Sequence, residues 1–458
     1  MRPRFLPLAS LLAACAAAPP GADGAAEPAE AGTLPGADGG REAEGDALPP
    51  DRDAGGATGD ARASAGVKSG VLLFGTSAPI EGLSYASGSQ TGTTDASGTF
   101  RYESGKPVTF RAGDLVLGAP QGGDVLSPYP LAANDSCDDS DDLKKVVAVL
   151  EALDTDHTPA NGIKLPASPS NGPIKLLSQT SWADLGGIVP ALPAPLEALR
   201  AFIAVFDGEA WMTIATDAFG APSAALRGQG VTTDGTSWFF SGTTGLERTD
   251  TAYASTASNP LAIPVALVIA GSDHIGDIDY WSGKLYAPIE DKKYQAPKVV
   301  LFDPTSLSSG TVFSISATLQ TKGVPWIAVD GPRAVAYMAE WDPTPGINVF
   351  ALNDMSFVRT IDLSRATGRV QGGKVYKRQL YLTVDDDQKR VYKVHLASGT
   401  LLEVLTLGLS GMELEGLAFL TRPDGSSMHT SNVNAARNGV DFRHHKITRE
   451  PLRWKTCP

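Results

Sequence analysis

Gln229-Gly230-Val231 begins a motif that recurs through the C-terminal half of the chain, in which a glycine leads into an extended apolar run. The central positions 230, 276, 326, 372 and 416 are 46, 50, 46 and 44 residues apart. A repeat of this length with several short strands per unit is typical of a β-propeller blade. The other copies are Ile275-Gly276-Asp277-Ile278, Gln371-Gly372-Gly373, Glu415-Gly416-Leu417 and the degenerate Pro325-Trp326-Ile327-Ala328-Val329.

Each repeat continues with the same succession of turns and strands. A turn such as Asp234-Gly235 leads into an aromatic or β-branched strand such as Trp238-Phe239-Phe240. An Xxx-Gly turn between apolar runs indicates a hairpin. The pattern predicts a mainly β chain, with a five-bladed β-propeller over residues 226–447 and a tail over residues 448–458. Fourth strands are expected at residues 263–269, 311–317, 357–361 and 401–407.

The fifth repeat lacks a fourth strand, and this predicts how the ring closes. An open outer edge would expose unpaired backbone groups. The stretch Trp211-Met212-Thr213-Ile214-Ala215-Thr216 is extended in character and precedes the first repeat. We therefore predict that it supplies the missing outer strand. It belongs to a connector over residues 176–225, in which helices are expected at residues 181–185 and 194–206.

The N-terminus resembles that of a bacterial lipoprotein. Arg2 and Arg4 precede a short apolar stretch, and Leu12-Ala13-Ala14-Cys15 resembles a lipobox, in which the Cys15 sulfur receives diacylglycerol. Residues 1–15 would then be a signal peptide and lipobox. Ala16 after the cysteine implies the outer membrane, so the resemblance points to a lipid-anchored protein of the cell envelope. A plain signal peptide cut at an Ala-x-Ala-like site is the alternative.

Residues 16–66 form a predicted disordered tether. They consist of Ala, Gly, Pro and acidic residues, and ten acidic residues against three arginines give them −7 of the chain's net charge of −13. With almost no large apolar side chains, such a segment cannot offset its ordering entropy. The rest of the chain is only mildly acidic. This argues against a nucleic-acid partner.

Residues 67–175 are predicted to form a small separate module with a helix over residues 143–153. The run Ser97-Gly98-Thr99-Phe100-Arg101-Tyr102 and the later Val108-Thr109-Phe110 are similar to β-sandwich modules found N-terminal in bacterial surface lipoproteins. Cys137 lies in this module and Cys457 in the tail. A disulfide between them requires Cα atoms within about 7 Å, and two separate thiols are the alternative.

The candidate site residues lie on the repeat motif. In a propeller the innermost strands line a central channel, so their first residues converge. Carboxylates, a histidine and amides around one axis can hold a small polar ligand, or a cation such as calcium with Asp277 and Glu415 as ligands. The alternative is that they satisfy backbone groups and enclose ordered water. The set is Gln229, His274, Asp277, Gln371 and Glu415.

A second set of polar residues is expected at the channel mouth or on loops, while His444-His445 is expected on a solvent-facing edge. None of the short fingerprints of serine hydrolases, zinc proteases or nucleotide-binding loops occurs. The second set is Asp279, Glu290, Asp330, Glu413, His429, Asn432 and Asn434.

The repeat region resembles the secreted NHL-, lactonase- and gluconolactonase-like families over about residues 226–447. Asp273-His274-Ile275-Gly276-Asp277-Ile278 and Glu413-Leu414-Glu415-Gly416-Leu417 match them best. The Glu415-Gly416 pair is similar to the metal-binding Glu-Gly of gluconolactonase-like enzymes. That family has six blades and this glutamate in the first, whereas here it lies in the last of five, so the catalytic assignment does not transfer.

Two functions follow from these observations. The first is a lipid-anchored extracytoplasmic β-propeller that binds or scaffolds a ligand or a protein partner. The alternative is a calcium-dependent hydrolase that acts on a lactone, ester or phosphoester in the propeller channel. The resemblance is specific for the fold and weak for activity.

Overall fold

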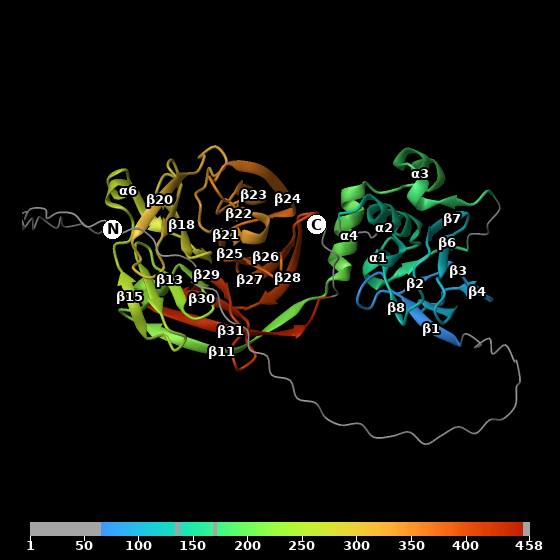
Figure 1. Ribbon diagram of the computed structural model, residues 1–458, viewed down its shortest axis with the longest axis horizontal. Helices are drawn as coiled ribbons and strands as arrows, with labels where there is room; N and C mark the ends of the chain where they lie inside the picture. Colours follow the sequence, from blue (N-terminus) through green and yellow to red (C-terminus); the bar gives the residue numbers. More distant parts are fainter. Residues whose placement is uncertain (1–65, 133–136, 138, 168–171, 452–458) are drawn as a thin grey trace, which may run out of the picture. The chain divides into compact units, whose positions relative to one another are not determined.

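The computed structural model describes residues 66–132, 137, 139–167 and 172–451. The protein is mainly β, with its strands gathered in many small, mostly antiparallel sheets (Figure 1). The predicted signal peptide, Cys15 and nearly all of the predicted tether lie outside the described residues. Cys137 is disulfide-bonded, but Cys457 also lies outside the described residues, so the predicted pair stays a prediction.

The strands of the N-terminal module bury alternate side chains. In β5, for example, Phe100 and Tyr102 are buried and Arg101 is exposed, because successive side chains of a strand point to opposite faces. One sheet has the order β5-β1-β8, a second has the order β10-β7-β6-β3-β4, and β2 pairs with β9. The bounds are β1 (Val67–Leu72), β2 (Ile80–Glu81), β3 (Ser84–Ser87), β4 (Gln90–Thr93), β5 (Thr99–Glu103), β6 (Thr109–Ala112), β7 (Leu115–Gly118), β8 (Val125–Leu126), β9 (Ile163–Lys164) and β10 (Lys175–Leu176).

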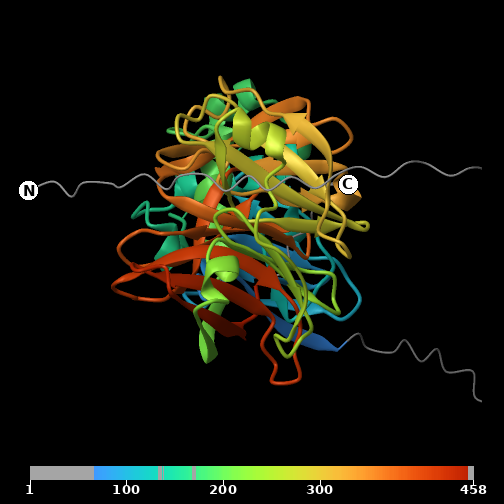
Figure 2. The same cartoon turned by 90° about the vertical axis from the view of Figure 1, so that its left-hand side faces the viewer.

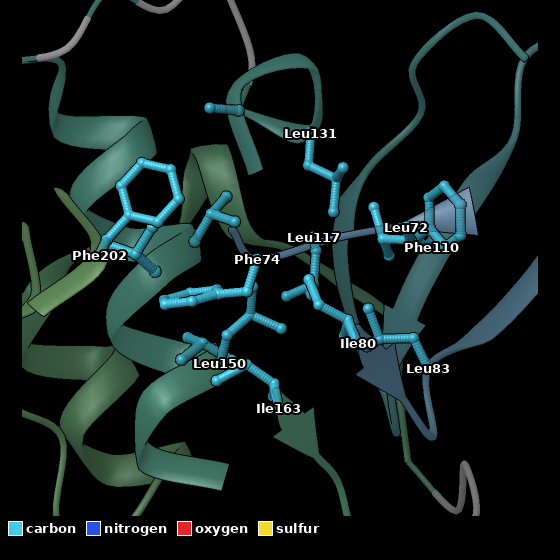
Figure 3. Packing of buried hydrophobic residues seen from close by; sticks show 14 of the residues in the cluster. Leu72, Phe74, Ile80, Leu83, Phe110, Leu117, Leu131, Leu150, Ile163 and Phe202 are labelled. Atoms are coloured by element: carbon cyan, nitrogen blue, oxygen red, sulfur yellow. The ribbon is translucent and has the colours of Figure 1, made fainter. Parts of the chain in front are cut away.

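Helices complete the core of this module, and the three predicted helices are confirmed. The Ser140 hydroxyl accepts the Leu143 N–H at 3.1 Å and so caps α2. Phe202 of α4 packs edge-on against Phe74, with ring centroids 5.1 Å apart (Figure 3). A helix assigned from sequence to the connector therefore shares one core with the module. The helices are α1 (Pro128–Leu131), α2 (Asp141–Leu153), α3 (Trp182–Ile188) and α4 (Pro195–Phe206), with short turns η1 (Pro159–Asn161) and η2 (Leu177–Gln179).

Five antiparallel sheets follow along the chain, one for each predicted repeat. Four have four strands, and one has the additional short strand β17. Their members, from the inner strand outward, are β12 (Gly230–Thr233), β13 (Trp238–Ser241), β14 (Leu246–Thr249) and β15 (Ser255–Asn259); β16 (Ser272–Ile275) with β17 (Asp279–Trp281), β18 (Lys284–Asp291), β19 (Lys298–Phe302) and β20 (Ser309–Ser314); β21 (Ala328–Asp330), β22 (Val335–Met338), β23 (Thr344–Ala351) and β24 (Phe357–Thr367); β25 (Val370–Tyr376), β26 (Gln379–Val384), β27 (Arg390–His395) and β28 (Thr400–Thr406); and β29 (Met412–Phe419), β30 (Met428–Asn434), β31 (Gly439–Arg449) and β11 (Ala210–Gly220). Short helices α5 (Ala224–Arg227), α6 (Val265–Ile269) and η3 (Gly331–Arg333) lie between strands.

The inner strands of consecutive sheets contact one another, and the last contacts the first. Strand β12 contacts β17, β17 contacts β21, β21 contacts β25 and β25 contacts β29. Strand β29 in turn contacts β12. The motif glycines permit this approach, because any side chain would collide. A Cβ atom on Gly416 would lie 2.7 Å from the Gly230 Cα atom, and one on Gly276 would lie 2.0 Å from the Pro325 carbonyl oxygen. The recurring glycine therefore reflects close backbone packing.

One predicted outer strand is wrong. Residues 263–269 do not form a strand; they include α6, and the outer strand of that sheet is β15. Pro264 precedes the helix and has no N–H to donate to a sheet ladder. Ile263 instead packs in the core between neighbouring sheets. The outer strands predicted near residues 311, 357 and 401 are confirmed as β20, β24 and β28.

The predicted closing strand is confirmed. Strand β11 pairs antiparallel with β31, from Ala210 opposite Arg449 to Gly220 opposite Gly439. The sheet order is β11-β31-β30-β29, so this sheet combines a strand from before the first repeat with three strands of the last. Trp211 is buried and lies edge-on to Phe419, with ring centroids 6.2 Å apart.

Removing β11 is expected to destabilise all five sheets cooperatively. A chain that begins at Ala221 lacks this ladder and also lacks Asp207 and Glu209, whose carboxylates lie 2.5 and 2.6 Å from the buried Lys393 ammonium. An unpaired buried charge costs about 3–5 kcal/mol. Calorimetry should show a lower melting temperature for the Ala221 chain. Deletion of residues 20–60 from the intact protein is the control and should leave the melting temperature unchanged. Equal melting of the Ala221 chain and the intact protein would contradict the closure.

Candidate ligand-binding pocket

Four of the five predicted site residues meet at one small pocket. Its volume is about 170 Å³. Gln229 directly precedes β12, His274 is on β16, Gln371 is on β25 and Glu415 is on β29, so four different sheets contribute. The remaining wall comes from residues that the sequence analysis placed elsewhere or missed. The lining residues are Gln229, His274, Glu290, Tyr294, Pro325, Trp341, Gln371, Glu415 and Arg437.

His274 is held between two oxygen atoms. Its Nδ1 atom lies 3.0 Å from the Glu290 Oε1 atom, and its Nε2 atom faces the Gln229 Oε1 atom. The Gln229 amide nitrogen donates to the Gly228 carbonyl at 2.9 Å, so the amide orientation is determined. Both ring nitrogens therefore contact side-chain oxygen atoms, one from Glu290 and one from Gln229. Glu290 also accepts the Val324 N–H at 2.8 Å.

Glu415 is buried, and burial raises its pKa well above the ordinary value, although Arg437 opposes this shift. Burial therefore disfavours the charged form of this side chain, whose Oε1 atom accepts a hydrogen bond from the Gln229 amide at 3.4 Å. Arg437 forms an ion pair with Glu413, and its Nη1 atom lies 3.8 Å from the Glu415 Oε1 atom. Arg437 thus contacts two carboxyl groups at the edge of the pocket.

Gln371 is the pocket side chain most available to a ligand. Within the described part of the chain, its amide makes no hydrogen bond, while it lines the pocket half-buried. Trp341 and Tyr294 supply aromatic surface beside it. The pocket therefore offers amide donors and acceptors next to aromatic walls.

Asp277, the fifth predicted residue, does not line this pocket. It is fully buried, and its Oδ1 atom accepts the Val231 N–H at 2.9 Å. Its Oδ2 atom accepts the Gly373 N–H at 3.2 Å and a hydrogen bond from the Lys374 ammonium at 3.3 Å. Asp277 thereby links three sheets, which matches the structural alternative given for it. Burial raises its pKa to about 7, although Lys374 and the backbone amides favour the charged form.

Other residues of the second set also make contacts within the protein, and those of Asp279 reach two neighbouring sheets. Asp279 accepts the Thr232 hydroxyl at 3.0 Å and the Val329 N–H at 2.8 Å. Asp330 accepts the Arg333 N–H and pairs with its guanidinium. Asn434 receives the Asn438 and Gly439 N–H groups in a turn. Asn432 is buried, and no hydrogen bond of its side chain occurs among the described residues.

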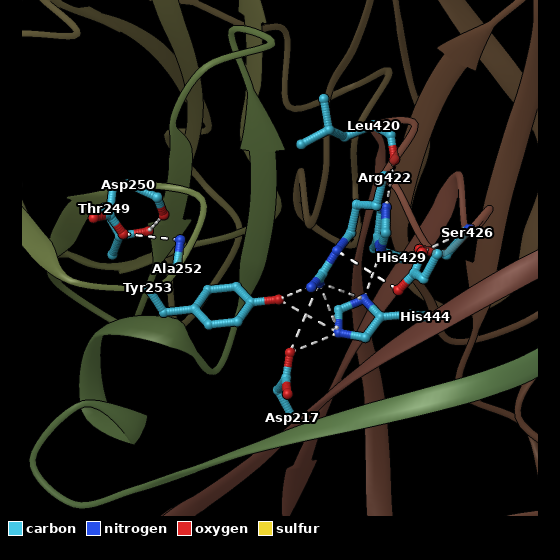
Figure 4. Close-up of polar contacts among 11 residues, drawn as sticks. Asp217, Thr249, Asp250, Ala252, Tyr253, Leu420, Arg422, Ser426, His429 and His444 are labelled. Atoms are coloured by element: carbon cyan, nitrogen blue, oxygen red, sulfur yellow. Dashed lines mark hydrogen bonds and ion pairs between the residues drawn. The ribbon is translucent and has the colours of Figure 1, made fainter.

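The prediction that His444 and His445 lie on a solvent-facing edge is wrong. Both are almost fully buried, because β11 covers β31 on its outer side and removes the edge. His444 contacts Asp217 of β11 through Nε2 at 2.9 Å and His429 through Nδ1 at 2.7 Å (Figure 4). His429 in turn contacts the Leu420 carbonyl at 2.8 Å. Burial lowers the pKa of His429 to about 3.

The sequence analysis missed Lys374, Arg437 and Trp341. Lys374 follows Gln371-Gly372-Gly373 in the inner strand β25, and a lysine at this position was an available indication of a buried ion pair. Arg437 lies in the turn after β30, and no local pattern distinguishes it.

The predicted metal role of Asp277 and Glu415 stays a prediction. Within the described residues, no three His, Cys, Asp or Glu side chains are placed to hold one metal ion. In the same residues, no helix is long and apolar enough to cross a membrane.

No protein-family model and no curated protein matches the sequence. Among solved structures, the chain is similar to hydrazine synthase of Kuenenia stuttgartiensis, with 15% identity and a TM-score of 0.30 over 45% of this chain and 56% of that one. It is also similar to a protein of unknown function from Bacteroides thetaiotaomicron, with 10% identity and a TM-score of 0.34 over 55% of this chain and 69% of that one. U3-55K matches with 10% identity and a TM-score of 0.32 over 50% of this chain and 98% of its own. The chain spans less than two thirds of the hydrazine synthase chain. These likenesses are too low to indicate a shared function.

Proposed function

We propose that this chain is a lipid-anchored cell-envelope protein whose five sheets form a closed five-bladed β-propeller, and that the pocket binds a small, neutral, hydroxyl-rich ligand. Support for the ring comes from the succession of inner-strand contacts, which returns from β29 to β12. Further support comes from β11, which completes the last sheet with a strand from before the first repeat. Support for the membrane anchor is the lipobox resemblance at Cys15.

The observation that carries the ligand proposal is the convergence of four polar side chains from four sheets on one pocket. A hydroxyl group needs both donors and acceptors, and the amide of Gln371 supplies both. Trp341 and Tyr294 offer aromatic surface on which the C–H faces of a sugar or polyol pack.

The charged side chains and the volume of the pocket further restrict the class of ligand. Glu290 contacts His274, and Arg437 pairs with Glu413, so these ionisable side chains already have partners within the protein. The volume of about 170 Å³ is below the roughly 300–1,000 Å³ of pockets for drug-sized ligands. A monosaccharide or a short polyol matches this space.

Replacing Gln371 with alanine is expected to weaken binding without affecting the fold. Calorimetric titration with a panel of neutral monosaccharides and polyols should identify a ligand for the native protein. Q371A should raise its dissociation constant about tenfold or more, because lost hydrogen bonds leave ligand hydroxyls unpaired at about 1–3 kcal/mol. Q388A, at an exposed glutamine, is the matched control and should bind normally.

Two results would contradict the ligand proposal. One is that no neutral probe binds, and the other is that Q371A binds as tightly as the native protein. Stabilisation by calcium chloride that E415Q abolishes would instead favour the calcium-dependent hydrolase, since a metal that binds only the native state raises its melting temperature.

The lipid anchor is tested by metabolic labelling. Cells that express the native chain should incorporate labelled palmitate into it, and C15A should abolish the label because the thiol is the acylation site. A variant of another cysteine, C137A, is the control and should keep the label. Label that persists in C15A would contradict the lipoprotein assignment.

A further inference from the structure

A charge-free segment at the outer edge of two sheets exposes an unusually apolar surface. Residues 251–272 contain no Asp, Glu, Lys or Arg. They comprise β15, the short helix α6 and the chain that leads to β16. Asn259 donates a hydrogen bond to the Leu307 carbonyl at 3.0 Å and so joins this segment to the next sheet. Figure 1 labels α6 beside β20 at the left of the view, and Figure 2 turns this side toward the viewer.

Helix α6 and the residues before it are apolar on both sides. On the inner side, Ala262 and Ile263 are buried in the core between two sheets, and Leu267 packs against it. On the outer side, Leu261, Val265, Val268 and Ile269 have exposed fractions of 80, 75, 52 and 82%. We call these four residues the apolar tip. Its three most exposed members are the most exposed large hydrophobic side chains in the described part of the chain.

A helix that is apolar all round is ordinarily buried, and contiguous exposed apolar surface marks a site of interaction with a protein or a membrane. The inner side of α6 already has its partner in the core. The outer side of α6 has no packing partner among the described residues. Burial of each of its aliphatic side chains would lower the free energy.

The chemistry of the tip favours lipid over a protein partner. Protein interfaces are built around Trp, Tyr and Arg anchors that fill pockets, whereas the tip consists only of aliphatic side chains that protrude into solvent. Two basic residues flank it. Ser272, just after the tip, pairs with Asp291 in the sheet. This register brings the exposed Lys292 and Lys293 close to the end of the apolar tip.

Lysines beside an apolar surface are suited to a membrane interface. Their ammonium groups lie at the level of anionic headgroups while aliphatic side chains enter the acyl region. One of the two, Lys292, contacts the Asp273 carboxylate at 3.1 Å, whereas the exposed Lys293 forms no ion pair among the described residues and supplies a free ammonium group beside the tip. We propose that the apolar tip inserts into the interfacial region of a lipid bilayer and holds this part of the protein against the membrane, independently of any lipid on Cys15.

The test is vesicle flotation of the full chain carrying C15A, so that no lipid anchor contributes. We expect this protein to float with vesicles of equimolar phosphatidylethanolamine and phosphatidylglycerol, and to remain bound in high salt because burial of apolar surface resists screening. V265D and I269D should each lower the partition coefficient about tenfold or more, as expected for loss of one buried aliphatic side chain.

Matched variants test whether vesicle binding depends on the apolar tip or on exposed apolar side chains in general. V358D introduces the same change at another exposed valine, on β24, and should float as the parent does. I269S removes the aliphatic side chain without adding charge and should also reduce flotation, which keeps the test valid if an aspartate variant misfolds. Unchanged melting temperatures show that the fold is intact.

Three outcomes would overturn the proposal. The first is that the C15A chain does not float with these vesicles. The second is that V265D, I269D and I269S float as well as the parent. The third is self-association that V265D disperses while no vesicle binding occurs, which would make the tip an interface between two copies of the chain. None of these results depends on the ligand pocket or on palmitate incorporation.

Discussion

Replacing Asp277 with alanine is expected to lower the free energy of unfolding by about 3–5 kcal/mol, the range for breaking a buried ion pair. The substitution leaves the Lys374 ammonium buried with only the Ile278 carbonyl at 2.5 Å and the more distant Asp279 carboxylate at 3.7 Å. It also removes the acceptor of the Val231 and Gly373 N–H groups. Urea unfolding followed by circular dichroism measures the loss.

Two further variants make this result specific. D387A, at an exposed aspartate, is the control and should change stability by less than about 0.5 kcal/mol. Adding K374M to D277A removes the orphaned ammonium and should restore part of the stability, so that the two substitutions are not additive. A loss below about 1 kcal/mol in D277A would show that Asp277 does not link the sheets as described.

The second large effect is acid destabilisation through His429. Its folded-state pKa of about 3 lies below the ordinary histidine value of 6.5, because burial disfavours the imidazolium. Between these values the unfolded chain binds a proton that the folded protein does not. The stability from His429 is therefore fully present above pH 6.5 and is lost as pH falls. By pH 4 the loss from this one group is about 3 kcal/mol.

The variant H429Q isolates this contribution. Buried carboxyls act in the opposite direction: burial raises the pKa of Asp277 to about 7 and that of Glu151 to about 8, so their contributions fall as pH rises. The difference between native and H429Q unfolding free energies, followed from pH 4 to pH 7, cancels those groups. This difference should shrink as the pH falls. H157Q, at an exposed histidine, should follow the native curve, and an H429Q curve parallel to the native one would contradict the prediction.

His429 also connects the closing strand to the rest of its sheet. One hydrogen-bonded chain joins Asp217 on β11, His444 on β31 and His429 on β30. Arg422 and Tyr253 both contact His444, and the Arg422 guanidinium donates to the Tyr253 hydroxyl at 2.6 Å (Figure 4). Protonation of His429 would disrupt this chain at the strand pairing that joins the two ends of the repeat region. Acid sensitivity is therefore expected to be concentrated at the closing sheet.

Much of the architecture was determined by local sequence pattern. The spacing of the Gln229-Gly230 motif predicted the five sheets, because each glycine marks a backbone approach that any side chain would block. The apolar face of residues 143–153 predicted α2. The missing fourth strand of the last repeat predicted β11, because unpaired sheet edges are unfavourable. These features depend on residues close together in the chain, or on a count of strands.

Only the tertiary structure decided what each polar side chain does. Asp277 and Gln371 belong to equivalent motifs, yet one is buried among backbone amides and the other lines a pocket. His444 is buried because a strand more than two hundred residues earlier in the chain covers it, and residues 263–269 fail as a strand because Pro264 and a distant core redirect them. Burial and hydrogen-bond partners are set by residues far apart in the sequence, and no local pattern contains that information.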